Sequence, residues 1–314
     1  MNTGRLVVAI WLTLLCGSAS ATPYTALYSF GDSNSDSGRR FQLEGLPLPP
    51  YYQGRHSNGP AAVETLAADL SVSLTNFAVG GAFSGHGNID TSHNNVLAQT
   101  GLLDQLNTFV TGLNGQQANP NALYFIWGGA NDFNALGANP TNAQLTATTT
   151  AVILNTEALI QSLSDSGAHH FFVVDRFGGA GADFFNISLL NAMQSFDLTI
   201  PGDIKFFDAR TVVLGMRSPT NPYGFTHLLG SDPCYLGSFT SGSPACVDPD
   251  HYVTWDTEGH LTAKASAILG NAMAAAAVPE PNSFLLLAVC LGALALRRLK
   301  RSSGHWAHQE QGRE

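Results

Sequence analysis

Charged residues are scarce in this chain. Lys, Arg, Asp and Glu together make up 12% of the sequence, and the formal net charge is −9 with no basic patch in the central region. A nucleic-acid-binding protein usually carries a basic surface, so that class of function is disfavoured. Apolar residues still make up 44%, which argues against a disordered chain. Low charge, with loops that rely on Gly, Ser, Thr and Asn instead, suits a secreted protein.

Cysteine is also rare. Of the four cysteines, Cys16 and Cys290 lie in apolar segments near the two ends, and Cys234 and Cys246 lie in a loop rich in Gly and Ser. In an exported chain this pair predicts a disulfide bond, because exported proteins fold in an oxidising compartment. No histidine pattern accompanies the pair, so a zinc site is not indicated.

No apolar run reaches the roughly 20 residues that a membrane-spanning helix needs. At the N-terminus Arg5 precedes an apolar run over residues 6–15, and the small residues 19–21 follow. This order of charge, apolar run and small residues is typical of a secretory signal peptide. We therefore predict a signal peptide over residues 1–21, removed after Ala21.

The C-terminal region has a second apolar run. Residues 279–281 read Pro-Glu-Pro, residues 284–296 are apolar, and four cations follow within residues 297–301. A buried C-terminal helix is the alternative, but a core helix does not normally carry four cations at its end. The flanking cations could extend the short run to membrane-spanning length and would keep this end in the cytoplasm.

Residues 278–301 resemble the PEP-CTERM sorting signal of Gram-negative bacteria. The resemblance implies transient anchoring in the inner membrane through residues 279–301, followed by cleavage near the Pro-Glu-Pro element by an exosortase-type peptidase. A polar tail, residues 302–314, extends beyond that signal. The implied destination is the periplasm, the cell surface or the extracellular matrix.

The remaining residues, 22–278, are enough for one α/β domain with a full core. Short apolar strands alternate with helical patterns, which predicts a mostly parallel five-stranded sheet covered on both faces. Ligands of such sheets bind beyond the carboxyl ends of the strands. The predicted strands are residues 26–30, 74–78, 122–127, 171–175 and 204–208, and the predicted helices are residues 60–70, 140–166, 188–197 and 261–276.

Three segments place polar groups directly after a predicted strand. Residues 31–38 read Gly-Asp-Ser-Asn-Ser-Asp-Ser-Gly, residues 76–81 end in a double glycine, and residues 128–132 read Gly-Gly-Ala-Asn-Asp. Each alone indicates only a turn. The first also resembles a calcium loop, but Ser37 and Leu43 occupy the positions that need glycine and glutamate.

A fourth segment, residues 255–262, carries His260 just before the last predicted helix. A single histidine at a helix start is more often structural than catalytic. The chain contains no Gly-x-Ser-x-Gly sequence, which disfavours an ordinary α/β-hydrolase.

Together and in this order, the four segments resemble the motif blocks of the GDSL or SGNH hydrolases. Residues 54–64 and 246–256 are similar to two further stretches of that family, so the likeness extends over residues 22–278. It implies a three-layer α/β/α fold of the flavodoxin-like kind and a serine esterase or lipase without a cofactor.

The resemblance assigns roles residue by residue. Ser33 is the expected nucleophile, and His260 is the expected base that removes its proton. The Ser33 and Gly81 N–H groups and the Asn131 side chain are the expected oxyanion hole, each donor contributing about 10²–10³ in rate.

The acid that orients His260 departs from the family spacing. The family places it three residues before the histidine, where this chain has Thr257, and Asp256 lies four before. We predict Asp256, and expect Glu258 to point elsewhere. Asp248 and His251 do have the family spacing, but they lack the residues that normally surround it.

The predicted function is hydrolysis of a carboxylic ester: a lipid, short-chain or acetyl-sugar ester. Residues 41–57 and 84–95 are expected to shape the pocket, and the apolar stretch 46–52 mildly favours an acyl or aryl group. Two alternatives remain open: a non-catalytic or weakly active surface or exopolysaccharide-associated protein on the same fold, and an acyltransferase.

Overall fold

A five-stranded, wholly parallel sheet forms the centre of the fold in the computed structural model, which describes residues 24–91, 95–240 and 244–278. Its strand order is β2-β1-β3-β4-β5. The strands are β1 (Ala26–Gly31), β2 (Ser73–Asn76), β3 (Leu123–Trp127), β4 (His170–Val174) and β5 (Asp203–Phe207). This confirms the predicted α/β class, and each strand begins and ends within about two residues of its prediction.

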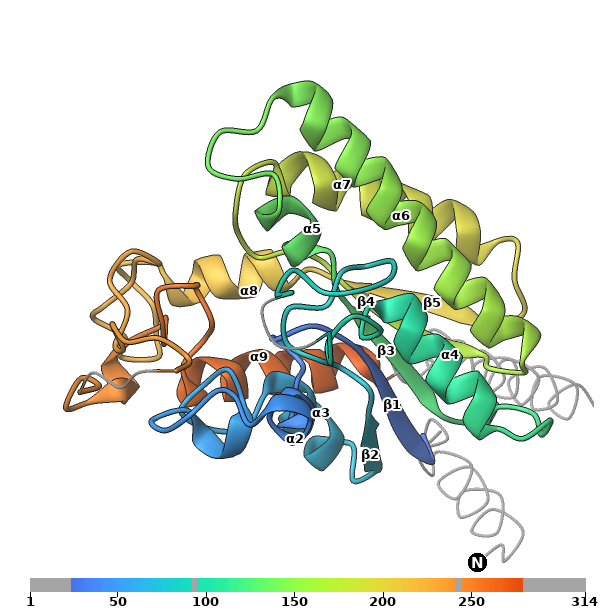
Figure 1. The fold of residues 1–314 in the computed structure, drawn as a ribbon, viewed down its shortest axis with the longest axis horizontal. Coiled ribbons are helices and arrows are strands. Elements are labelled where there is room, and N and C mark those ends of the chain that lie inside the picture. Colours follow the sequence, from blue (N-terminus) through green and yellow to red (C-terminus); the bar gives the residue numbers. More distant parts are fainter. Residues whose placement is uncertain (1–23, 92–94, 241–243, 279–314) are drawn as a thin grey trace, which may run out of the picture. The chain divides into compact units, whose positions relative to one another are not determined.

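Helices cover both faces of the sheet (Figure 1). Alternate residues of the central strand β3 enter separate cores. Phe125 packs with one set of helices and Tyr124 with the other, and every residue of β3 is buried. Continuous burial without polar alternation is the pattern of an inner parallel strand. The helices of the first core are α3 (Ala62–Asp69), α8 (Ala209–Met216) and α9 (Ala263–Ala277), and those of the second are α4 (Leu102–Gly112), α5 (Ala130–Asn134), α6 (Asn142–Asp165) and α7 (Ala182–Asp197).

The ends of α6 follow from local sequence. Thr141 Oγ1 caps the first turn by accepting the Gln144 N–H, and Gln144 Oε1 accepts the Thr141 N–H in return. This reciprocal pair satisfies two donors that a helix start leaves free. Gly167, just past the end, has φ +104°, which side chains disfavour. These signals explain why α6 was predicted closely.

Helices α3 and α9 also begin and end within two residues of their predictions, but other helices were missed or mispredicted. Helix α7 begins at Ala182, six residues before its prediction, because its N-cap, Gly181, offers no side-chain oxygen as a start signal. Helices α4 and α8 were not predicted at all. Four further short helices also escaped prediction: α5, α2 (Arg39–Glu44), η1 (Tyr52–Gly54) and η2 (Pro249–His251).

Cys234 and Cys246 form a disulfide bond with their Cα atoms 4.9 Å apart. The bond closes a loop between α8 and α9 and lies beside a small core of Tyr51, Tyr235 and Trp255. Trp255 belongs to the segment that leads to His260. The disulfide loop and that segment therefore pack in the same small core.

The predicted signal peptide, sorting segment and polar tail lie outside the described residues. Among the residues that are described, no helix combines the length and the apolar character needed to cross a membrane.

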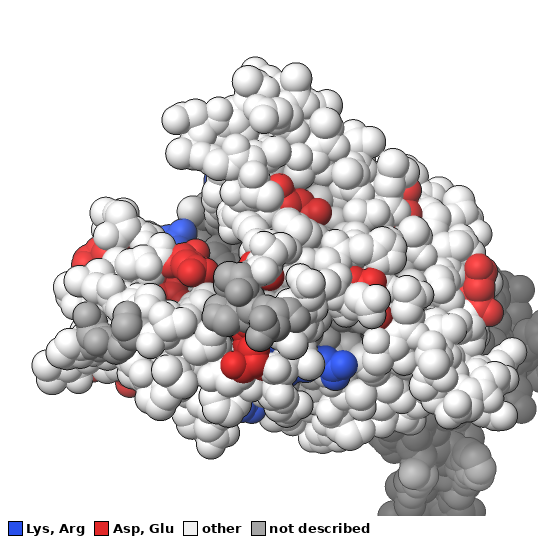
Figure 2. All heavy atoms as spheres, viewed as in Figure 1, with Lys and Arg blue, Asp and Glu red and all other residues white. Residues whose placement is uncertain are grey.

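Figure 2 shows a face of the molecule on which charged side chains are few and scattered among uncharged ones.

Candidate active site

Ser33, Gly81, Asn131 and His260 come from four distant segments and line one cavity of about 430 Å³. Ser33 follows β1, Gly81 follows β2, Asn131 lies in α5 after β3, and His260 lies just before α9. The carboxyl ends of neighbouring parallel strands meet at one edge of the sheet, where ligand sites of such folds occur. The structure therefore brings all four predicted segments together at the same cavity.

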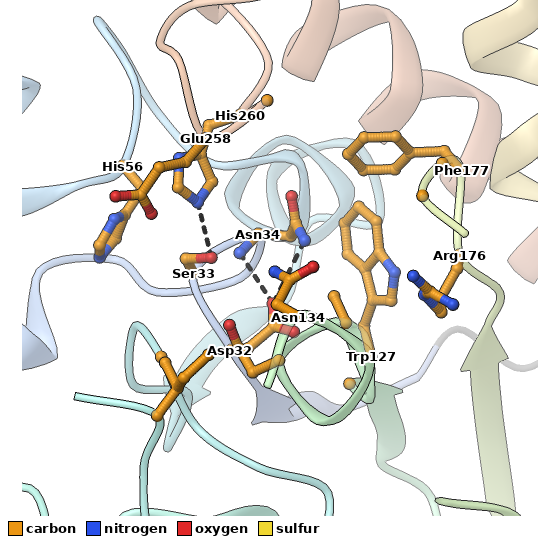
Figure 3. Close-up of a pocket in the computed structure, with 18 of the residues that line it drawn as sticks. Asp32, Ser33, Asn34, His56, Trp127, Asn134, Arg176, Phe177, Glu258 and His260 are labelled. Carbon is orange, nitrogen blue, oxygen red and sulfur yellow. Dashed lines mark hydrogen bonds between the residues drawn. The ribbon is translucent and has the colours of Figure 1, made fainter. Parts of the chain in front are cut away.

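A chain of hydrogen bonds joins three of the predicted residues. His260 Nε2 lies 2.7 Å from Ser33 Oγ, and His260 Nδ1 lies 2.8 Å from Asp256 Oδ2. The dashed line between His260 and Ser33 in Figure 3 marks the first of these contacts. Both distances are within hydrogen-bond range, and Asp256 and His260 are both buried.

A tight turn explains how Asp256 reaches His260 across four residues. The Gly259 N–H donates to the Asp256 carbonyl, and Gly259 has φ +92°. The backbone N–H groups of Glu258 and His260 both donate to Asp256 Oδ1, leaving Oδ2 for the imidazole. The unusual spacing is therefore compatible with a direct contact.

Tyr51 is a partner of this acid that sequence reasoning missed. Its hydroxyl donates to Asp256 Oδ2 at 3.0 Å, and the Tyr51 ring is buried against Tyr235 and Trp255. Nothing in the local sequence around Tyr51 distinguishes it from the exposed Tyr52 beside it. The apolar stretch 46–52 was expected to favour an acyl or aryl group of the substrate, but none of it lines the cavity.

Burial and charge oppose each other at His260. Burial lowers its pKa, while Asp256, Glu258 and Asp32 raise it, and the net pKa lies above the ordinary 6.5. Burial raises the pKa of Asp256. The nearby His260 and the donors to the carboxylate lower it by more, so the net pKa of Asp256 falls below 3.8. The pair thus favours a carboxylate beside an imidazole with increased basicity.

Three hydrogen-bond donors are available at the cavity. Among the described residues, the backbone N–H groups of Ser33 and Gly81 donate to no protein acceptor. The Asn131 amide donates to the Ala82 carbonyl at 2.9 Å, which uses one of its two N–H bonds. Gly81 has φ +84°, and a Cβ there would stand 2.3 Å from Asn88 Oδ1, so glycine is required.

The buried carboxylate of Asp36 stabilises the loop that contains Ser33. Asp36 accepts backbone N–H bonds from residues 38, 39 and 40 and from Gly80. It thereby ties the loop after β1 to the double glycine after β2. Asp32 accepts from the backbone and side chain of Asn34. The alternation that resembled a calcium loop is thus used for hydrogen bonds that hold the turn.

Other residues considered from the sequence lie elsewhere or act differently. Asp248 pairs with His251 at 3.2 Å on the surface, away from the cavity. Glu258, expected to point elsewhere, lines the cavity beside His260 without bonding to its ring (Figure 3). The loops expected to shape the pocket contribute His56, Ile89 and Asp90.

His56 is a further residue that the sequence did not single out. Its ring lies 5.0 Å from the His260 ring, and neither of its nitrogens has a hydrogen-bond partner among the described residues. Burial and the nearby His260 and Arg40 lower its pKa well below the ordinary value. The His56 side chain is therefore uncharged and lines the cavity beside His260.

Comparison with known proteins identified two family models. A GDSL-like lipase/acylhydrolase model matches residues 27–273, and a PEP-CTERM protein-sorting model matches residues 277–301. A phosphatidylcholine-sterol acyltransferase of Aeromonas hydrophila is 28% identical over 303 residues, covering 86% of this chain and 85% of that protein.

Solved structures with a similar arrangement include two family 2 carbohydrate esterases. The enzyme from Corynascus thermopiles has a TM-score of 0.44 at 16% identity, covering 82% of this chain and 68% of that one. An active-site mutant from Clostridium thermocellum has a TM-score of 0.44 at 12% identity, covering 80% and 62%.

Proposed function

Because this chain belongs to the GDSL-like lipase/acylhydrolase family, we propose that it is an exported serine hydrolase that cleaves carboxylic esters through an acyl-enzyme on Ser33. The family membership and the PEP-CTERM motif were both expected from the sequence, and both matches confirm them. The observation that carries the proposal is the hydrogen-bonded series Ser33–His260–Asp256.

Proton transfer to His260 starts the proposed reaction. A serine hydroxyl is a weak nucleophile, and the base at 2.7 Å removes its proton as Oγ attacks the ester carbonyl. His260 then gives that proton to the leaving alcohol, which departs and leaves an acyl group on Oγ. A water molecule, deprotonated by His260, hydrolyses this acyl-enzyme and restores Ser33.

The negative oxygen of each tetrahedral intermediate needs donors that are already in place. The Ser33 and Gly81 N–H groups and the free N–H bond of Asn131 would supply them. Donors held by the fold before the reaction need no reorganisation as charge develops, so each contributes about 10²–10³ in rate.

A fluorophosphonate probe tests the nucleophile directly, since it labels only an activated serine. We expect labelling of the wild type and of Ser188→Ala, which changes a half-buried serine side chain on α7 outside the cavity. We expect none with Ser33→Ala. An unlabelled wild type, or equal labelling of Ser33→Ala, would favour a non-catalytic surface or exopolysaccharide-associated protein.

Acyl transfer is the second candidate, supported by the likeness to the phosphatidylcholine-sterol acyltransferase along most of both chains. The same acyl-enzyme serves both reactions, and the acceptor, water or an alcohol, decides between them. Incubation with a p-nitrophenyl ester and an added alcohol separates the two: a new ester product indicates transfer, and free acid alone indicates hydrolysis.

Sorting completes the proposal. The PEP-CTERM motif is typical of exported proteins of Gram-negative bacteria. We propose that the chain leaves the cytoplasm with a signal peptide over residues 1–21. Residues 279–301 would then anchor it in the inner membrane until an exosortase cuts near Pro279–Pro281. The periplasm, the cell surface and the extracellular matrix are all consistent destinations.

A further inference from the structure

Two arginines line the same cavity as Ser33. Arg176 follows β4, and Arg217 follows α8. In Figure 3 Arg176 lies on the opposite side of Trp127 from Ser33, so it borders a part of the cavity away from the hydroxyl. The proposed chemistry at Ser33 and His260 uses neither guanidinium.

Arg176 is buried with most of its donors unused. Its guanidinium carbon lies 3.9 Å from the centre of the Phe133 ring, and Nη1 donates to the Ala180 carbonyl at 3.3 Å. Within the described part of the chain no other acceptor contacts its five N–H bonds, and no carboxylate forms an ion pair with it. Gly179 leaves space for it, because a Cβ there would lie 2.6 Å from Nη2.

Arg217 is half-buried and also has few partners. Its Nη2 makes one long contact of 3.4 Å to Thr254 Oγ1, and its Nε is buried without a partner. Among the described residues it too forms no ion pair. Gly230, which also lines the cavity, lies against this guanidinium and carries no side chain to cover it.

Neighbouring charges do not neutralise these arginines directly. Asp32 and Asp132 attract Arg176 from beyond ion-pair distance, and burial raises the pKa of Asp32 to about 6. Arg210 repels both guanidiniums and is itself paired with Asp183. By contrast, Arg40, the third arginine of the cavity, is paired with both Glu44 and Asp90.

A buried cation without a partner is costly, and its pKa reflects that cost. Burial lowers the pKa of Arg176 to about 10 and also lowers that of Arg217. A guanidinium presents a planar fork of donors that matches carboxylate and phosphate oxygens. An oxyanion that reaches either guanidinium in the cavity would satisfy its unused donors.

We propose that Arg176 and Arg217 form an oxyanion subsite, so that the substrate is an ester carrying a phosphate, sulfate or carboxylate group away from the bond that is cleaved. This inference rests on the proposed ester hydrolysis at Ser33 and specifies its substrate class.

Matched ester pairs test the subsite. Monoacylglycerol and its 3-phosphate differ only by an anion on the alcohol side. p-Nitrophenyl butyrate and p-nitrophenyl succinate both have four-carbon acyl chains and differ in a terminal methyl or carboxylate group. We expect kcat/KM to be about tenfold or more higher for the anionic member of at least one pair, the effect of one charge-assisted hydrogen bond. The preferred pair identifies the anion and its side of the ester.

Variants show which residues cause the preference. Arg217→Gln should reduce the anionic-to-neutral ratio of kcat/KM about tenfold. Arg176→Lys, which keeps the buried charge but loses the planar guanidinium that lies over Phe133, should also reduce it, because the planar fork is lost. The control is Lys264→Gln, which removes a cation on α9 outside the cavity and should leave the ratio unchanged.

Failure of the subsite and failure of the hydrolase proposal give different results. An active enzyme with equal kcat/KM within both pairs, or an unchanged ratio in Arg217→Gln, would overturn the subsite alone. If no ester is cleaved, calorimetry with Ser33→Ala decides the matter. Binding of glycerol 3-phosphate, sulfate or acetate but not glycerol, lost with Arg217→Gln added, supports the subsite, and no binding overturns it.

Discussion

Asp256 carries the most unusual feature of the site, an acid four residues before its histidine. The carboxylate accepts two backbone N–H bonds, the Tyr51 hydroxyl and the imidazole. Four donors on one buried carboxylate keep it ionised and hold it in a single orientation. The contact therefore depends on the turn and its packing, and not on the family spacing.

Removing the charge of Asp256 should impair the base. In Asp256→Asn we expect kcat/KM to fall about 10³–10⁴-fold, because the carboxylate selects the tautomer and orientation of His260. The matched control is Asp248→Asn, which alters the exposed pair with His251 and should leave kcat/KM unchanged. Equal losses in both variants would contradict the assignment of Asp256.

The pH profile gives a second measure of the same contact. His260 acts as a base only when neutral, and its pKa is raised, so activity should appear as pH rises through a value above 6.5. Without the Asp256 charge the largest effects that raise the pKa of His260 are lost, and Glu258 and Asp32 alone oppose the lowering effect of burial. The acid limb of kcat/KM should therefore move to lower pH. An acid limb of the wild type below 6.5 would argue against the raised pKa.

Tyr51 is expected to position Asp256 without touching the substrate. Tyr51→Phe should lower kcat by about tenfold with little change in KM, because one hydrogen bond to a buried charge is lost. Tyr52→Phe is the neighbouring control, since the Tyr52 ring is exposed and its hydroxyl has no hydrogen-bond partner within the described residues. A change in KM alone would place Tyr51 in substrate binding instead.

At the scale of elements, the close contact of α3 with α9 stabilises the position of His260, which lies just before α9. Gly270 of α9 lies against α3, where a Cβ would stand 2.5 Å from both the Ala62 carbonyl oxygen and Thr65 Cβ. The segment that ends in His260 runs directly into α9, and the Ala263 N–H donates to Asn58 Oδ1. Separation of these two helices would therefore displace the base.

Two glycine substitutions test this packing. Gly270→Ala should reduce the free energy of unfolding by about 1–3 kcal/mol through overpacking. Gly215→Ala in α8, where a Cβ would meet nothing within 4 Å, should be neutral or stabilising by about 0.5–1 kcal/mol. Urea denaturation of both variants provides the measurement, and similar midpoints would show that α3 and α9 can separate without cost.

At the scale of the whole molecule, the hydrolase domain and the sorting motif follow one another almost directly, since the two matches end and begin within residues 273–277. The proposed order of events is export, membrane anchoring and release. The candidate site lies within the described residues, so we expect the release step to change the location of the protein and to leave kcat unaffected.

Replacing Pro279, Glu280 and Pro281 by alanine should block release. In a Gram-negative host with an exosortase, the wild type should leave the membrane fraction with a lower mass, and the variant should remain there at full length. The esterase activity of both forms should be equal. Release of the variant at the wild-type rate would show that the Pro-Glu-Pro element is not the recognised feature.

How much the sequence could predict differs between elements. Strands and the well-capped helix α6 were close to their predictions because apolar runs, caps and turn residues are local signals. Helix α7 starts with Gly181 and lacks such a signal, so its first turn and a half escaped prediction. Helix α4 follows Gly101, which has no side chain to cap the first turn. Helix α8 does begin with a capping residue, since Asp208 accepts the Thr211 N–H, and that signal was overlooked.

The sequence by itself determined the fold class, the family and the order in which Ser33, Gly81, Asn131 and His260 occur, because these depend on periodicity and motif spacing. The tertiary structure alone decided which side chains meet. Tyr51 reaches Asp256 across 205 residues, and Arg176 and Arg217 border the cavity of Ser33 from different elements. Contacts between side chains so far apart arise only when the sheet brings its strand ends together, and no local pattern encodes them.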